Sequence, residues 1–270
     1  MSSLSTPASH PAEPAGPAPL LVLLDPVARQ ADGESVRIAK DVLCGGADVK
    51  VVMPESPSEL DRVLSHRGRR RPVVIGSDPA VQRALQALHR QRELGTDPIG
   101  VIPVGRPPAT AAARTLGVPA EPVAAARAVL GGSPRKQDLL IDDGGGVVLS
   151  EVRFTGGRWG RTDGWRSLWA KFAAPEQGKL PAAEEVRIEA DGRLLADLHQ
   201  HVSRLRISVA DGCMEIVLRL DGEPCRHRAA SLTVTGRGFG YQADGRPSGP
   251  VRQRTWTVHA GAWELLLPAG

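Results

Sequence analysis

The first half of the chain alternates short apolar runs with segments whose apolar residues recur at the helical period. The run at 20–24 is apolar throughout and ends at Asp25-Pro26, as expected for a strand buried in a parallel sheet. The same pattern predicts strands at 20–24, 49–53, 73–75 and 99–104, and helices at 34–43, 56–64, 81–88, 109–116 and 123–130. Strands that alternate with helices at these lengths predict βαβ units and a parallel sheet.

The second half changes to short runs separated by Asp-Gly pairs. The pairs begin at 191, 211, 221 and 244, and the runs lie at 186–189, 205–209, 214–220, 231–235 and 255–258. Asp-Gly turns between short strands predict an antiparallel β-rich region. We therefore expect a disordered, proline-rich leader at 1–18, an α/β nucleotide-binding-like domain at 19–132 and a β-rich domain at 133–270. The pattern leaves open a return of the final strand to the first domain.

One turn in the first half has the form of a phosphate-binding loop. The predicted strand at 73–75 stops at Gly76, a polar turn follows, and Pro79 begins the next helical pattern. Free N–H groups at the start of a helix attract anions, and a glycine allows a phosphate to approach the backbone. However, Pro79 has no N–H to donate. The position of the turn suggests nucleotide binding, whereas its residues argue against tight binding.

Composition narrows the classes of function. The chain is 41% hydrophobic and 24% charged, with a net charge of +4, which favours anionic ligands or membrane surfaces over nucleic acid. Three widely spaced cysteines imply no disulfide framework. The His and Cys residues of the second half match no standard zinc spacing, so we predict no protein-bound metal cluster. With no targeting or membrane-spanning segment visible, we expect a cytoplasmic protein, with peripheral membrane association and homo-oligomers left open.

Aromatic residues are scarce, yet four of the nine lie between Trp159 and Phe172 and interleave with basic residues. Tryptophan with arginine suits a membrane interface. The alternative, which we favour, is that these rings cover a join between the domains.

Four segments resemble, in order, the motifs of the diacylglycerol kinase catalytic-domain family, whose fold is shared with NAD kinases. Asp25-Pro26 stands where the family has Asn-Pro, and Gly-Ser-Asp-Pro-Ala at 76–80 stands where it has Gly-Gly-Asp-Gly-Thr. The segment Pro-Val-Gly-Arg-Pro-Pro-Ala at 103–109 corresponds to the family's Pro-x-Gly-Thr-x-Asn-Asp. Near the end of the chain, Asp-Gly-Arg at 244–246 corresponds to its Asp-Gly-Glu. The resemblance covers nearly the whole chain. It implies an N-terminal α/β domain, a C-terminal β-rich domain, and ATP with Mg²⁺ in the cleft between them.

The resemblance also assigns candidate site residues. Those that it places around the nucleotide are Asp25, Gly76, Ser77, Asp78 and Gly105, and it places Asp244 nearest the chemistry. Arg106 is a further candidate, because the second loop lacks the family's polar residues and an arginine can bind a phosphate bidentately in their place. The family's glutamate, thought to act as general base, is Arg246 here, and an arginine cannot accept a proton. Asp78 is equally well explained as a helix cap, and Asp244 better as a hairpin-turn residue. The literal Asp-Gly-Glu string at 221–223 is better explained as a turn.

These observations predict a diacylglycerol kinase-like lipid kinase that transfers a phosphoryl group from ATP to a lipid hydroxyl, with reduced activity. The alternative is an inactive homologue that binds a lipid, a nucleotide or a protein partner, because residues are lost from all three motif loops.

Overall fold

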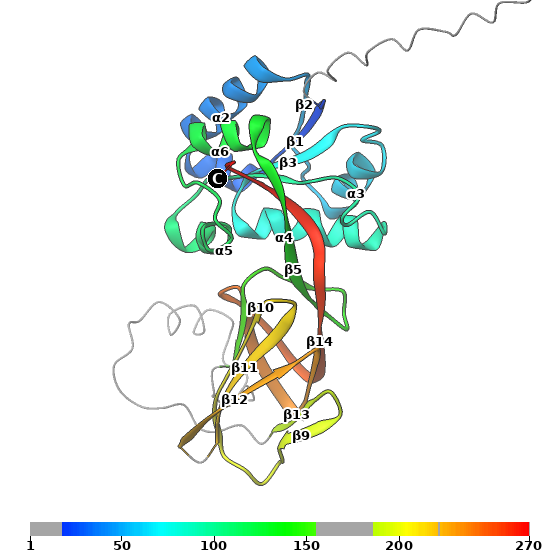
Figure 1. Cartoon of the computed structure of the whole chain (residues 1–270), viewed down its shortest axis with the longest axis vertical. Helices are drawn as coiled ribbons and strands as arrows, with labels where there is room; N and C mark the ends of the chain where they lie inside the picture. Colours follow the sequence, from blue (N-terminus) through cyan, green and yellow to red (C-terminus); the bar gives the residue numbers. More distant parts are fainter. Residues whose placement is uncertain (1–17, 155–185, 221, 270) are drawn as a thin grey trace, which may run out of the picture.

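The computed structural model describes residues 18–154, 186–220 and 222–269, which form an α/β region and a β-rich region (Figure 1). The predicted leader, up to residue 17, and the Trp159–Phe172 segment lie outside the described residues. Within the described ranges, no helix is both long and apolar enough to cross a membrane.

The α/β region contains the predicted parallel sheet. Its strands are β1 (Leu20–Leu24), β2 (Val49–Val52), β3 (Arg71–Gly76) and β4 (Gly100–Pro103), in the order β2-β1-β3-β4. The helices are α1 (Pro26–Ala31), α2 (Gly33–Gly46), α3 (Pro57–Ser65), α4 (Asp78–Arg90), α5 (Ala111–Thr115) and α6 (Pro122–Gly131), with a 3-10 turn η1 (Pro107–Thr110) before α5. Helix α2 packs on α6, and α3 packs on α4. Because the strands are parallel, their carboxyl ends all lie at one edge of the sheet.

Local sequence signals explain how these helices begin. The Ser56 hydroxyl accepts a hydrogen bond from the Glu59 N–H at 3.2 Å, and the Glu59 carboxylate accepts one from the Glu55 N–H at 2.9 Å. This exchange is close to a capping box, and it places the start of α3 where the sequence predicts it. Helix α1 was not predicted, because its six residues are too few for an apolar period to be visible.

The β-rich region is antiparallel, as its Asp-Gly turns predict, and its strands form one ten-stranded sheet. Its strands are β5 (Ser133–Asp142), β6 (Val147–Val148), β7 (Glu151–Phe154), β8 (Val186–Ala190), β9 (Arg193–Ala196), β10 (Val202–Ala210), β11 (Cys213–Leu220), β12 (Glu223–Ala229), β13 (Ser231–Ala243) and β14 (Arg246–Leu267). Strands β9 and β12 were not predicted, because β9 is only four residues long and polar residues dominate β12. Leu220 on β11 pairs with Glu223 on β12, which agrees with the turn favoured for the 221–223 string, although residue 221 itself lies outside the described residues.

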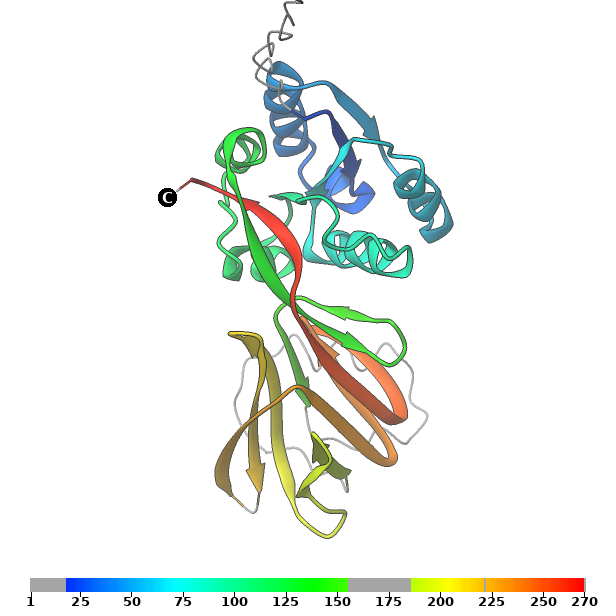
Figure 2. The ribbon, with the colours of Figure 1, turned by 45° about the vertical axis from the view of Figure 1, so that its right-hand side comes forward.

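Strand β14 returns to the α/β region and joins the two regions. Its residues 256–267 pair with β5 over the length of that strand, and the two form the long red and green ribbon of Figure 2. At its far end, Leu266 donates to the Ile99 carbonyl at 3.0 Å, so β14 lies beside the segment that leads into β4. It also places one tryptophan in each apolar core, Trp263 in that of the α/β region and Trp256 in that of the β-rich region. The change from helix to strand after Gly132 coincides with the predicted boundary, but independent domains on either side remain a prediction.

Candidate functional site

The turn after β3 is closed by a side chain from another strand end. Ser77 precedes α4, and its hydroxyl donates to the Asp25 carboxylate at 2.6 Å. The Ser77 backbone N–H donates to the same oxygen at 3.3 Å. A Cβ atom at Gly76 would lie 2.3 Å from the Cβ of Asp25. The glycine therefore permits the close approach of Asp25, in the place where the sequence suggested a phosphate.

Asp25 is fully engaged by the protein. Besides Ser77, its carboxylate accepts from the Val27 N–H at 3.2 Å, which caps α1, and lies 3.4 Å from the Arg83 guanidinium of α4. The Asp25 side chain is 1% exposed. A buried carboxylate with this many donors is a structural link between β1, β3 and α4.

Asp78 connects the first turn of α4 to the second loop. Its two carboxylate oxygens accept from the N–H groups of Ala112 and Ala113, at 2.8 and 3.0 Å. Burial raises the pKa of the Asp78 carboxyl above its ordinary value, although these two hydrogen bonds act in the opposite direction. The donors that Asp78 engages are those at the start of α5, so it caps a helix other than its own.

The second loop, between β4 and η1, contains Gly105 and Arg106. Gly105 has a φ of 139°, a conformation that favours glycine, and its surroundings leave room for a Cβ. Arg106 is exposed, and its side chain makes none of the hydrogen bonds or ion pairs found among the described residues. The phosphate contact suggested for Arg106 remains a prediction.

Asp244 lies at the turn between β13 and β14 and contacts α4. Its carboxylate accepts from the Gln82 amide at 2.5 Å and from three consecutive backbone N–H groups, those of Leu149, Ser150 and Glu151, at 2.7 to 2.9 Å. Burial raises the pKa of Asp244, against the effect of these four donors. The contact with Gln82 brings Asp244 close to Asp78, one turn earlier on α4, so the fold does unite the second and last motifs.

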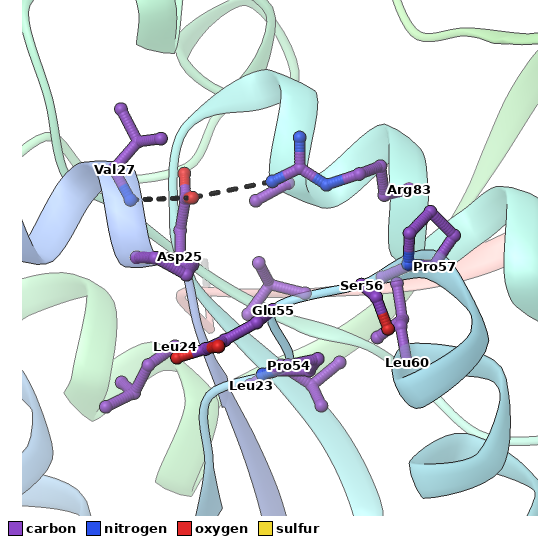
Figure 3. Close-up of a pocket in the computed structure, with 14 residues that line it drawn as sticks. Leu23, Leu24, Asp25, Val27, Pro54, Glu55, Ser56, Pro57, Leu60 and Arg83 are labelled. Atoms are coloured by element: carbon purple, nitrogen blue, oxygen red, sulfur yellow. Dashed lines mark hydrogen bonds and ion pairs between the residues drawn. The ribbon is translucent and has the colours of Figure 1, made fainter.

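A pocket of about 330 Å³ opens at the carboxyl ends of the strands (Figure 3). The residues that line it come from the ends of β1 and β3, the segment after β2, and helices α1, α3 and α4. Leu23, Leu60 and Val74 make its floor apolar, and the polar side chains are those of Asp25, Glu55, Ser56 and Arg83. Pockets of this volume with a few polar groups suit small molecules.

The charges at this edge fit a triphosphate with Mg²⁺ poorly. Arg83 is the basic residue of the pocket lining and lies 3.4 Å from Asp25, and Glu55 adds a second acidic side chain to the lining. At two positions of the turn no N–H is available to a phosphate. The Ser77 N–H binds Asp25, and Pro79 has no N–H. Mg²⁺ needs free carboxylate oxygens, but those of Asp78 and Asp244 bind N–H groups. Among the residues that the structure describes, no three acidic, His or Cys side chains form a group that could hold a metal ion.

The sequence missed Arg83 and Glu55 as pocket residues. Arg83 carried no signal, since a single arginine on a helix is ordinary. Glu55 carried one, because it directly precedes the predicted start of α3, and that start lies at the same sheet edge as the motif turns. Of the predicted site residues, Asp25 lines this pocket.

The sequence matches no protein-family model and no curated protein. Solved structures do match its fold. A putative diacylglycerol kinase from Bacillus anthracis str. Sterne has a TM-score of 0.73 at 12% identity, covering 96% of this chain and 98% of that one. Two further structures from the same strain, described as a putative diacylglycerol kinase and as a diacylglycerol kinase, have TM-scores of 0.71 and 0.70, each at 14% identity and covering 93% of this chain and 97% of theirs.

This chain has the diacylglycerol kinase fold. The likeness confirms the two-part architecture implied by the motif order, with a parallel sheet first and an antiparallel sheet second. At such low identity the likeness concerns the fold, so the roles of individual residues depend on the contacts described above.

Proposed function

We propose that this protein is a lipid-kinase-like binding protein that holds the nucleoside part of a nucleotide in the strand-end pocket and has lost efficient phosphoryl transfer. The observation that carries the proposal is the contact between Asp25 and Ser77, in which a carboxylate takes the N–H and hydroxyl donors that a phosphate would need. Phosphoryl transfer relies on positioned donors and cations around the phosphates. The turn after β3 offers neither.

The pocket supports a nucleoside better than a free phosphate. Its apolar lining residues suit a base, and the carboxylate of Glu55 can accept hydrogen bonds from sugar hydroxyls or an exocyclic amine. A phosphate placed beside the carboxylates of Asp25 and Glu55 would be repelled. The expected order of affinity is therefore adenosine at or above ADP, and ADP above ATP, which is the reverse of a phosphate-binding site.

One observation favours a second candidate, a slow lipid kinase. Arg83 is 43% exposed and reaches the pocket from α4, so it can turn to meet a phosphate. In this case ATP would bind through Arg83. A lipid hydroxyl would then be phosphorylated at a rate far below the roughly 1 to 100 per second that is typical of protein kinases.

Calorimetry and an activity assay on the same folded preparation separate the two candidates. The binding proposal predicts heat of binding with adenosine and ADP, with or without Mg²⁺, and no phosphatidate from diacylglycerol and ATP above background. Phosphatidate formation that is lost in Arg83→Ala would instead support the slow kinase. Absence of any nucleoside or nucleotide binding would overturn both.

Two matched variants test the pocket itself. Val27 lines the pocket and is 66% exposed, so Val27→Trp should block ligand entry without disturbing the core. Val51, 37% exposed on the edge strand β2, is not among the lining residues, so Val51→Trp is its control. We expect ligand-induced thermal stabilisation to disappear in Val27→Trp and to persist in Val51→Trp, since only binding to the folded state raises stability.

Asp25→Asn tests whether the carboxylate excludes phosphate. It removes one negative charge beside the Ser77 N–H and should raise the affinity for ADP by about tenfold while leaving that for adenosine nearly unchanged. An equal change for both ligands would show that Asp25 acts on the nucleoside and not on the phosphates.

A further inference from the structure

One face of the large sheet is unusually rich in arginine. On the neighbouring strands β7, β10, β11 and β12, alternate residues point to opposite faces of the sheet, and the strand register places one set of alternate residues of all four strands on the same exposed face. The arginines of this face, which we call the arginine face, are Arg153, Arg204, Arg206, Arg219, Arg226 and Arg228. The strands β10, β11 and β12 that carry most of it are labelled in the lower part of Figure 1.

The arginine face holds an excess of positive charge. Its acidic side chains are Glu151 and Glu215, so six arginines stand against two glutamates. The resulting charge of +4 equals the formal net charge of the whole 270-residue chain. The rest of the chain therefore has no net formal charge, so this one surface accounts for the net positive charge of the protein.

Strand pairing forces some of these like charges together. Arg153 lies directly opposite Arg206, and this pair is compensated, because Glu151 forms ion pairs with both. Arg204 lies directly opposite Arg219 on β11. Like charges in directly opposed positions destabilise a sheet.

The second opposed pair has no such compensation. Within the described part of the chain, none of the ion pairs includes Arg204, Arg219 or Arg226. Arg226 adds to the crowding, since it lies diagonally across from Arg219 on β12. The sheet thus carries an electrostatic cost here that an external anionic surface would relieve.

We propose that the arginine face binds the surface of a membrane that contains anionic phospholipids. It extends over four strands spaced about 4.8 Å apart, which suits a surface carrying many phosphates rather than a single anion. None of the exposed residues of these strands is aromatic, so the face lacks the rings on which single-stranded nucleic acids stack. This inference does not depend on a functional nucleotide pocket.

Vesicle sedimentation with the full-length chain tests this inference. The wild type should bind phosphatidylcholine vesicles that contain phosphatidylglycerol and should not bind phosphatidylcholine alone, and added salt should weaken the binding. Each basic side chain near an anionic bilayer strengthens binding roughly fivefold. The triple variant Arg204→Gln, Arg219→Gln, Arg226→Gln should therefore bind about 100-fold more weakly.

A second triple variant serves as the matched control. Arg62, Arg69 and Arg127 are exposed on the α/β region and take part in none of the ion pairs of the described residues. Their change to glutamine removes the same charge and should leave vesicle binding within about threefold of the wild type. Melting curves check that both variants fold, and the test requires neither ATP nor diacylglycerol.

Three outcomes would overturn the proposal. They are no binding of the folded wild type to anionic vesicles, equal weakening by the two triple variants, and binding to single-stranded DNA without binding to anionic vesicles. The last outcome would assign the arginine face to nucleic acid.

Discussion

The α/β region and the β-rich region both place aspartates at turns, but they use them differently. In the α/β region, the carboxylates of Asp25 and Asp78 bind N–H groups of segments distant in the chain, and Asp25 also caps α1 at its own turn. In the β-rich region, Asp191, Asp211 and Asp244 all adopt the left-handed conformation, with φ between 47° and 52°, and each precedes a glycine with positive φ. There the backbone of the aspartate shapes the turn, as in the primed turns of β-hairpins.

Asp244 belongs to both groups, and so does Asp191, whose carboxylate accepts hydrogen bonds from the N–H groups of Ala230 and Ser231. The backbone of Asp244 forms a hairpin turn like those of Asp191 and Asp211, and its carboxylate binds Gln82 on α4 and three N–H groups of the β6–β7 connection. The comparison teaches that the same residue type can set local backbone shape, join distant segments, or do both. The variants below separate these roles, from the largest expected effect to the smallest.

Gly76→Ala should have the largest effect, because a new Cβ would lie 2.3 Å from the Cβ of Asp25. We expect the free energy of unfolding to fall by about 3 kcal/mol in urea denaturation. Gly45→Ala in α2 is the control, because no atom lies within 4 Å of its Cβ position, and it should be neutral or slightly stabilising. Equal stability of the two variants would mean that the approach of Asp25 to Gly76 is not tightly constrained.

Asp244→Asn should have a moderate effect on stability. Asparagine tolerates the left-handed turn, but its amide group cannot satisfy all the donors that converge on Asp244. We expect a loss of about 2 kcal/mol in urea denaturation. Asp211→Asn, at a turn of the same backbone conformation, should cost less than about 0.5 kcal/mol. Similar losses at both sites would contradict the joining role of the Asp244 carboxylate.

The pH dependence of this difference is the smallest expected effect. Burial raises the pKa of Asp244 in the folded chain, whereas the unfolded carboxyl titrates at about 3.9. The folded state therefore takes up this proton first as the pH falls. The stability of the wild type relative to Asp244→Asn should rise as the pH falls through the folded pKa, by at most about 1.4 kcal/mol per pH unit, and should level off below the unfolded pKa.

Urea denaturation of both proteins between neutral pH and the unfolded pKa measures this slope. If the stability of the wild type relative to Asp244→Asn instead falls as the pH falls, the four hydrogen bonds outweigh burial at Asp244 and the carboxylate is held ionised.

Local patterns predicted the elements whose residues carry a strong periodic or capping signal. The apolar run of β1 and the Ser-Pro-Ser-Glu start of α3 are examples, and both lie where they were expected. Strand β12 carries no such signal, because its exposed charged residues and Pro224 resemble a loop. It is a strand because β11 offers it backbone partners, which no local pattern records.

The sequence by itself determined the order of strands and helices, the positions of the turns and the shared fold, because apolar period and turn residues act over a few neighbours. Only the tertiary structure decided what the polar residues of those turns bind. Asp25 and Ser77 are far apart in the chain, as are Gln82 and Asp244, and each pair meets because the fold brings distant turns together. The same reason explains the arginine face, since β-strand register, and not spacing along the chain, places Arg204 opposite Arg219.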